Sequence, residues 1–291
     1  LGDVYKRQME YSPGLRGVIA GETKISTVGM EGTSLRYRGY DAIKLTETHT
    51  YEDAASLIIS DDLDGSEFTN NFIKYYGELT NDKDINKLFV EIKSRLHPMD
   101  VIRTVVSYIG DSDKNSDLES TTKILAAVSY VIASYNDNDT SELDQEYTVA
   151  SSMLSNKVST DELQALDDIL ILYAEHGFNA STFATRVTAS TRSDLTSSIV
   201  SGIGTLKGEL HGGANERAVE LINSFKDIND AETGVLKMLK EKKKIMGFGH
   251  GVYKIQDPRS PVVKRWVEKL VSDDDSKLRF EIAKKIDEIM D

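Results

Sequence analysis

Residues 98–110, with the sequence PMDVIRTVVSYIG, carry a pattern that recurs along most of the chain. Four apolar side chains follow the i, i+3, i+4, i+7 spacing of a helix with one apolar face: Ile102, Val105, Val106 and Ile109. Pro98 stands in the first turn, where a backbone N–H is not needed, and Gly110 follows the last turn. The stretch therefore predicts an amphipathic helix that packs against a core.

The same helical spacing recurs in later stretches, with apolar pairs such as Val128 and Val131, Leu166 and Leu170, Ala218 and Leu221, Val263 and Trp266, and Ile282 and Ile286. Ser159 and Glu162 have the spacing of a capping box at a helix start. Only residues 25–28 and 34–37 have strand character, and they flank a glycine-containing turn. The expected class is all-α and multi-helical, with a small N-terminal β-hairpin.

The composition excludes several functional classes. The net charge of the 291 residues is −13, whereas nucleic-acid binders and membrane-surface proteins need a basic face. The chain has no cysteine, which removes disulfides, thiolate metal sites and cysteine nucleophiles. The longest apolar stretch, residues 124–135, is too short to span a bilayer. We expect a protein that binds neither nucleic acid nor membrane, and the absence of cysteine is compatible with the cytosol.

Two further stretches carry expectations. Residues 179–208 are rich in Ala, Ser, Thr and Gly, which let helices approach closely, so a tightly packed centre or a subunit interface is expected there. A weakly helical surface segment is the alternative, and the apolar Phe183, Val187 and Ile199 favour burial. The acidic run at 272–276 predicts a solvated loop, as does the polar run at 136–141.

Three of the five histidines are each followed by glycine: His176, His211 and His250. Glycine allows an unusual turn and close approach of a ligand. The spacing matches no metal motif, so no metal is expected, although zinc and three separately buried histidines remain alternatives. His211 precedes the glycines that open a predicted helix, where the helix dipole favours a neutral ring that can donate to developing oxyanion charge.

The other two candidate features concern anionic ligands. His250 lies in a glycine-rich loop downstream of a lysine cluster, Lys237 to Lys244, which indicates either a phosphorylated partner or a solvated helix end. Arg259 follows Asp257 and Pro258 at a fixed turn and suits bidentate recognition of a carboxylate, with a surface ion pair as the alternative. The residues together indicate a carboxylated substrate beside a phosphorylated one.

At this point the chain resembles the citrate synthase family, in its bacterial and archaeal branch. The resemblance rests on segments in family order at residues 17–23, 37–41, 97–104, 175–179, 208–215 and 247–259. It implies a two-domain helical fold, with a large domain at 9–211 and a small domain at 212–291. It also implies a cytoplasmic homodimer of the tricarboxylic acid cycle that condenses acetyl-CoA with oxaloacetate and hydrolyses citryl-CoA.

The resemblance also implies residue roles. His211 would stabilise the enol of acetyl-CoA, His250 would polarise the oxaloacetate carbonyl, and His176 and Arg259 would hold oxaloacetate. Coenzyme A would be a co-substrate, with no permanently bound cofactor. It would lie along Ile245, Met246, Gly247, Phe248 and Gly249, with Lys254 near a phosphate.

The chain departs from the family pattern at Gly251, where many relatives carry arginine, and at both ends. We expect residues 1–8 to be a non-native leader, with Met9 as the start, and the chain to be C-terminally truncated. The family's catalytic Asp and later arginines have no matching segment here. We therefore expect weak oxaloacetate binding and no citrate formation by this chain. Two alternatives remain: 2-methylcitrate synthase, which uses propionyl-CoA, and a catalytically silent coenzyme A-binding paralogue.

Overall fold

The stretch at residues 98–110 forms a helix, α6 (Pro98–Ile109), in the computed structural model of the protein. The helix presents three fully buried valines to the core: Val101, Val105 and Val106. Gly110 ends the helix with a φ of +59°, a left-handed value that favours glycine. The predicted amphipathic helix is confirmed. The structure describes residues 19–29, 34–110, 115–136, 148–154, 158–248, 253 and 256–290.

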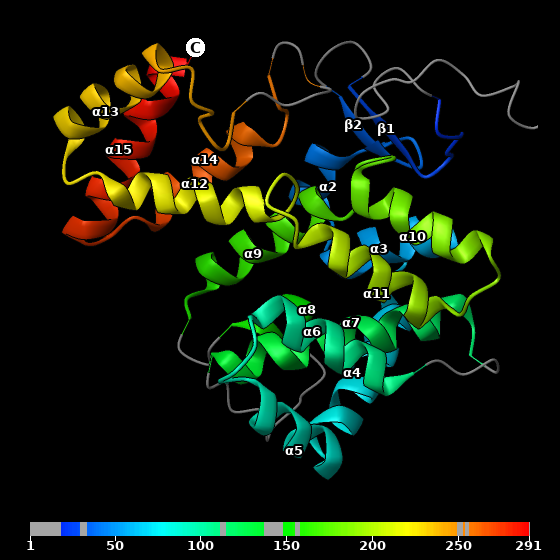
Figure 1. Ribbon diagram of the computed structural model, residues 1–291. Helices are drawn as coiled ribbons and strands as arrows, with labels where there is room; N and C mark the ends of the chain where they lie inside the picture. Colours follow the sequence, from blue (N-terminus) through cyan, green and yellow to red (C-terminus); the bar gives the residue numbers. More distant parts are fainter. Residues whose placement is uncertain are drawn as a thin grey trace, which may run out of the picture.

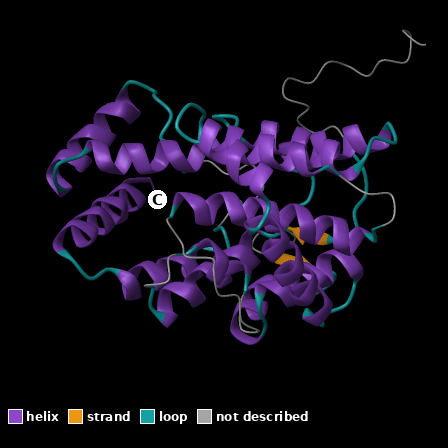
Figure 2. Cartoon of the chain, turned by 90° about the horizontal axis from the view of Figure 1, so that it is seen from below, coloured by secondary structure: helices purple, strands orange, loops and turns teal. Residues whose placement is uncertain are grey.

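Helices make up most of the described chain (Figure 2). A small sheet comes first, with β1 (Ser26–Val28), β2 (Leu35–Tyr37) and β3 (Tyr40–Asp41). In the described residues it is followed by α2 (Ala42–Thr48), α3 (Tyr51–Ser60), α4 (Ser66–Thr80), α5 (Lys83–Ile92), α6, α7 (Asp117–Tyr135), α8 (Val149–Met153), α9 (Thr160–Tyr173), α10 (Ala180–Ser190), α11 (Leu195–Leu206), α12 (Gly213–Ser224), α13 (Ile228–Lys240), α14 (Ser260–Leu270) and α15 (Asp274–Met290) (Figure 1). None of these helices is both long and apolar enough to cross a bilayer.

The predicted hairpin is confirmed, with β1 and β2 antiparallel and Ser26 opposite Tyr37. Strand β3 adds a third antiparallel strand that was not predicted, because two residues are too short to show an alternating pattern. Tyr37 is completely buried, and its hydroxyl donates to the carbonyl of Ile171, 2.8 Å away. The sheet is thereby fixed to the last turns of α9, which lead into the loop of His176.

The largest core lies among α3 to α8, with buried aromatic side chains on α4 and α7. Phe68, Phe72 and Tyr76 are completely buried on α4. Helix α9, whose start is fixed by the predicted Ser159–Glu162 capping box, packs against this core through Leu166 and Leu170. Burial of this kind contributes about 1.5–3 kcal/mol for each large apolar side chain, so this cluster is the main source of stability.

Helices α10 and α11 run side by side (Figure 1) and pack closely, as their small residues predict. A Cβ at Gly202 would lie only 2.3 Å from the Thr185 hydroxyl oxygen, so glycine permits this approach. The expected burial of Val187 is wrong, since its side chain is 51% exposed and α10 contains no buried residue. Helix α10 therefore packs on α11 with one side and leaves the other uncovered in the single chain.

The end of the chain builds a separate small core from α12, α13 and α15, in which Phe225, Val235 and Ile282 are buried. Helices α13 and α15 lie side by side (Figure 1). Helix α14 instead packs against α9, and the indole N–H of Trp266 donates to the buried Asp168 carboxylate at 2.6 Å. The expected small domain thus has its own core, while one of its helices contacts the larger part.

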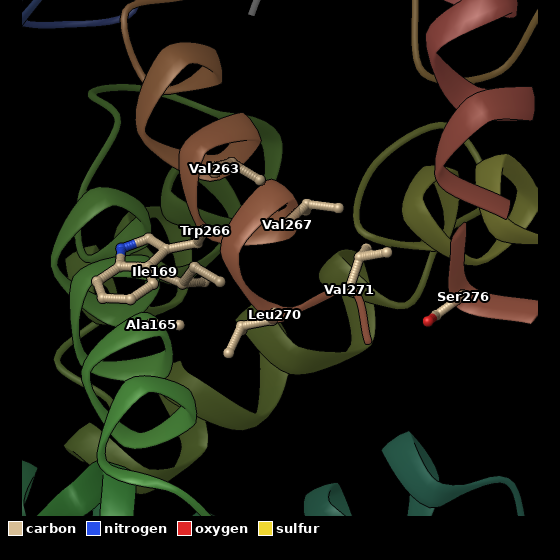
Figure 3. A pocket seen from close by; sticks show the side chains of 8 residues that line it. All are labelled: Ala165, Ile169, Val263, Trp266, Val267, Leu270, Val271 and Ser276. Carbon is tan, nitrogen blue, oxygen red and sulfur yellow. The ribbon is translucent and has the colours of Figure 1, made fainter. Parts of the chain in front are cut away.

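An apolar groove of about 270 Å³ lies beside Trp266, between α9, α14 and the start of α15 (Figure 3). Its lining includes Ile169, Val267, Leu270 and Val271, with the hydroxyl of Ser276 at one end. The lining residues include no histidine, arginine or carboxylate, so this groove is distinct from the candidate catalytic groups.

The acidic run at 272–276 is only partly a loop, because α15 begins at Asp274. Asp273 accepts a hydrogen bond from the backbone N–H of Ser276 at 2.9 Å, and Asp274 and Asp275 lie in the first turn. Acidic side chains are favoured there by the helix dipole, so the expected loop is wrong from Asp274 onward. Of the other expected loop, Asn136 caps the end of α7, and residues 137–141 lie outside the described residues.

Two buried carboxylates accept hydrogen bonds from backbone N–H groups at helix N-termini, where water would otherwise accept them. Glu52 accepts from the first backbone N–H of α8, that of Val149, at 2.7 Å. Asp167 accepts from the first backbone N–H of α3, that of Tyr51, with both oxygens at 3.2 Å. Burial, followed by the nearby Glu52 carboxylate, raises the pKa of Asp167 to about 7. The ionisation of Asp167 therefore makes the free energy of unfolding depend strongly on pH.

We predict that replacing Asp167 with Asn flattens the dependence of unfolding free energy on pH. Because the pKa of Asp167 is raised from 3.8 to about 7 in the folded chain, its contribution falls as pH rises through that window. At pH 8 the variant should be more stable by about 4 kcal/mol, and near pH 4 the difference should vanish. Urea unfolding at both values measures this.

Asp194→Asn serves as the control, since Asp194 caps α11 at the surface and its hydrogen bonds to Ser197 lower its pKa. That variant should lose stability at pH 8 rather than gain it. If the free energy of unfolding depended on pH equally in wild type and Asp167→Asn, the raised pKa of Asp167 would be contradicted.

Candidate active site

The ring of His211 lies between the starts of two helices. His211 directly precedes Gly212, the N-cap of α12. Its Nε2 is 3.3 Å from the backbone N–H of Ser181, in the first turn of α10, and 2.8 Å from the hydroxyl of Ser181. That hydroxyl also lies 2.8 Å from Oδ1 of Asn179, the N-cap of α10. Two helix N-termini therefore converge on one imidazole.

This placement keeps the imidazole uncharged. Burial lowers the pKa of His211, and the positive ends of two helix dipoles disfavour a second proton. The backbone N–H of Ser181 can only donate to Nε2, whereas the 2.8 Å contact with the Ser181 hydroxyl makes Nε2 an acceptor only when that hydroxyl donates to it rather than to Asn179. The burial of His211 and the two helix N-termini thus both favour the neutral ring that the sequence predicts, and burial is a cause that the sequence alone did not indicate.

Glycines bring the ring to this position. A Cβ at Gly212 would lie 2.5 Å from the carbonyl oxygen of Leu206, and one at Gly213 would lie 3.0 Å from that of Gly208. The backbone N–H groups of His211 and Gly213 both donate to Gly208, at 2.9 and 3.1 Å. The chain between α11 and α12 can turn this tightly only because these positions lack side chains.

His176 lies in the short loop between α9 and α10, near the same helix start as His211. Gly177 has a φ of +64°, and its N–H donates to the Glu175 carboxylate at 2.8 Å. A glycine next to this histidine is therefore required by the backbone, as the sequence analysis expects. The Nε2 atom of His176 is 3.0 Å from the hydroxyl of Tyr253.

Arg259 stands at the start of α14 with only 12% of its side chain exposed. Its Nε and Nη2 atoms contact the two oxygens of Asp257 at 2.9 and 2.7 Å. Although burial opposes the charged form, the Asp257 carboxylate raises the pKa of Arg259. The guanidinium also lies over the Tyr173 ring, 4.7 Å from its centre. Asp257 thus fixes one edge of the guanidinium in a bidentate pair within the chain, and the substrate carboxylate predicted for Arg259 would need its remaining donors.

Tyr253 connects these two residues. Its ring stands edge-on to His176, with 5.4 Å between ring centres, and lies 5.9 Å from the guanidinium carbon of Arg259. His176 and Arg259, separated by 82 positions in the printed sequence, are thereby brought into one cluster with Tyr253, Tyr173 and Asp257. We call this group the His176–Arg259 cluster.

The segment expected to line coenzyme A is described for residues 245–248. Ile245 is a core residue of the small cluster, Met246 is half-buried and Phe248 is 37% exposed. Gly247 has a φ of +97°, and a Cβ there would lie 3.5 Å from Ala218 of α12. The backbone here follows a turn that favours glycine. Gly249, His250 and Lys254 lie outside the described residues.

The lysine cluster surrounds the C-terminal end of α13. Lys237 and Lys240 occupy its last turn, where the helix dipole favours cations, and Lys243 pairs with Glu241 at 2.7 Å. This arrangement is compatible with both predictions for the lysines, a solvated helix end and a site for a phosphorylated partner.

Among the described residues, no group of three or more His, Asp or Glu side chains is arranged to hold a metal ion. Sequence reasoning gave no role to Tyr253, Tyr173 or Ser181. Asp257 was noted only as part of the turn before Arg259. The Asp-Pro-Arg spacing could have indicated the Asp257 contact, whereas no local pattern signals that Tyr253 meets His176.

The arrangement offers two kinds of chemistry. A neutral imidazole at two helix N-termini can donate a hydrogen bond to an oxygen that gains negative charge. A guanidinium fixed along one edge, beside a second imidazole, can bind a carboxylate through its remaining donors.

Comparisons with known proteins point to one family. The family model described as "Citrate synthase, C-terminal domain" matches residues 14–291. A 2-methylcitrate synthase of Shewanella oneidensis is 40% identical, covering 93% of this chain and 76% of that protein. A citrate/2-methylcitrate synthase of Bacillus subtilis is 35% identical, covering 91% and 76%.

A solved structure has the same fold along nearly the whole chain. The citrate synthase of Thermoplasma acidophilum, in a ternary complex with carboxymethyl coenzyme A and oxaloacetate, superposes with a TM-score of 0.85. It is 26% identical, and the match covers 97% of this chain and 79% of that one. Sequence and fold therefore agree, and the chain belongs to the citrate synthase family of enzymes.

Proposed function

We propose that this chain binds oxaloacetate and a short acyl-CoA thioester, the two substrates of the family's condensation. The observation that carries the proposal is the pairing of a neutral His211 at two helix N-termini with the His176–Arg259 cluster. The first can stabilise an enol, and the second can hold a dicarboxylate. The relative of known structure that binds both kinds of ligand has the same fold.

In this proposal oxaloacetate lies against the His176–Arg259 cluster. Asp257 engages Nε and Nη2 of Arg259, and among the described residues none contacts Nη1 through a hydrogen bond. A substrate carboxylate is therefore bound at the Nη1 side of the guanidinium. His176 donates a second hydrogen bond, and His250 polarises the ketone carbonyl.

The acyl thioester is bound at His211. In this proposal the ring proton is on Nδ1, with Nε2 accepting from Ser181, and the Nδ1–H donates to the thioester oxygen and stabilises the enol. The α-proton of the acyl group passes to a general base, a role that the resemblance gives to an Asp with no matching segment in this sequence. A neutral donor matches a weakly acidic enol better than an imidazolium does. Coenzyme A follows the backbone of residues 245–249, with Lys254 near a phosphate, and no other cofactor or metal is required.

The acyl group is acetyl or propionyl. Acetyl-CoA gives citrate and places the enzyme in the tricarboxylic acid cycle, whereas propionyl-CoA gives 2-methylcitrate. The names of the two reported relatives favour propionyl-CoA as a second substrate. One additional methylene changes binding by about 1–3 kcal/mol.

We also propose that α12, α13 and α15, within residues 212–291, move against residues 9–211 about the glycine-rich turn at 208–213, while α14 stays packed on α9. The tight backbone contacts of Gly212 and Gly213 make this turn a defined pivot. The separate core of α12, α13 and α15 allows them to move together, and closure excludes water from the enol. A cytoplasmic homodimer is proposed as well, with the uncovered side of α10 as its interface.

Replacing Arg259 with Gln should weaken oxaloacetate binding about 30- to 150-fold, since a hydrogen-bonded charge pair contributes about 2–3 kcal/mol. Calorimetric titration of the chain with oxaloacetate measures this. Arg265→Gln is the matched control, because Arg265 is exposed on the same helix, α14. Equal affinities in all three proteins would contradict the proposed site.

The acyl preference is tested with the oxaloacetate-saturated chain by titrating acetyl-CoA and propionyl-CoA separately. Both should bind, and His211→Ala should weaken both by the same factor, because the lost hydrogen bond goes to the thioester oxygen they share. Binding of coenzyme A with an affinity equal to that of both thioesters would contradict a role for His211 at the acyl group.

Light scattering after gel filtration tests the interface. The chain should elute as a dimer, and Val187→Glu should elute as a monomer, because the new charge would be buried in the contact. Val90→Glu, at a position 64% exposed on α5, is the control and should remain dimeric. A monomeric wild type would overturn the dimer proposal.

A further inference from the structure

Tyr253 makes two contacts with His176 and one with Arg259. Its hydroxyl oxygen is 3.0 Å from Nε2 of His176, and the two rings meet at 77°. Its ring centre is 5.9 Å from the guanidinium carbon of Arg259. Only 7% of Tyr253 is exposed. The side chain is therefore held between the two residues proposed to bind oxaloacetate.

The hydroxyl keeps its proton at neutral pH, since burial raises the pKa of Tyr253 to about 12. A tyrosine hydroxyl that donates to Nε2 requires that nitrogen to be unprotonated, which places the single proton of a neutral imidazole on Nδ1. The contact with the Tyr253 ring limits rotation of the His176 ring at the same time.

The Arg259 contact gives the same residue a second role. The guanidinium is enclosed by Asp257 along one edge, by the Tyr173 ring at 4.7 Å and by the Tyr253 ring. Tyr173 is 55% exposed, whereas Tyr253 is buried. Tyr253 is thus the buried aromatic neighbour of the guanidinium. The same Tyr253 side chain contacts both His176 and Arg259, so it affects the orientation of each.

We propose that Tyr253 is a positioning residue for oxaloacetate recognition. Its hydroxyl donates to Nε2 of His176 and fixes both the ring orientation and the Nδ1–H tautomer, while its ring fixes the position of the Arg259 guanidinium. This inference rests on the proposed function, in which His176 and Arg259 bind oxaloacetate.

Tyr253→Phe tests the hydroxyl, because phenylalanine keeps the ring contacts with His176 and Arg259 and removes only the donor. Long-range proton–nitrogen NMR spectra identify the tautomer of each histidine, and the chain has only five. His176 should be the Nδ1–H tautomer in wild type and a mixture in the variant. Tyr108→Phe, exposed on α6, is the control and should match wild type.

Oxaloacetate affinity is measured on the same three proteins. Loss of one positioning hydrogen bond should weaken binding by Tyr253→Phe about 5- to 10-fold, with no change for Tyr108→Phe. An unchanged His176 tautomer in Tyr253→Phe, or an Nε2–H tautomer in wild type, would overturn the inference. If wild type binds no oxaloacetate, the proposed function fails, and the tautomer comparison still decides the role of Tyr253.

Discussion

The contact between Ser181 and Nε2 of His211 joins the start of α10 to the turn between α11 and α12. Three features of the chain make this contact possible. Asn179 caps α10 and turns the first N–H groups outward, small residues let α10 lie close to α11, and Gly212 and Gly213 let the chain return tightly. A side chain larger than hydrogen at either glycine would meet a carbonyl oxygen and move His211 away.

The electrostatics of the site follow from the same arrangement. The chain is acidic, with a net charge of −13, so binding of the proposed anionic ligands needs positive potential that is concentrated locally. Helix N-termini and Arg259 supply it, and the buried Tyr253 and the more exposed Tyr173 lie beside the guanidinium. The neutral state of His211 and the charged state of Arg259 are thus consequences of neighbours, and each residue suits one of the two proposed ligands.

Sequence reasoning predicts those features that depend on local chemistry. The spacing in α6, the capping box at Ser159 and the hairpin are local, and all three are confirmed. The start of α15 was placed too late because Asp and Ser favour both loops and helix starts. The exposure of Val187 and the contact of Tyr253 with His176 depend on tertiary packing, which no short pattern contains.

The protonation state of His211 tests this account most directly. Long-range proton–nitrogen NMR of the chain at pH 7 should show one proton on the His211 ring, located on Nδ1, and Ser181→Pro, which removes the backbone donor, should disturb that assignment. An imidazolium at pH 7, or a neutral ring protonated at Nε2, would show that the two helix starts do not hold His211 as a neutral acceptor for Ser181. The proposed role at the acyl thioester would then fail.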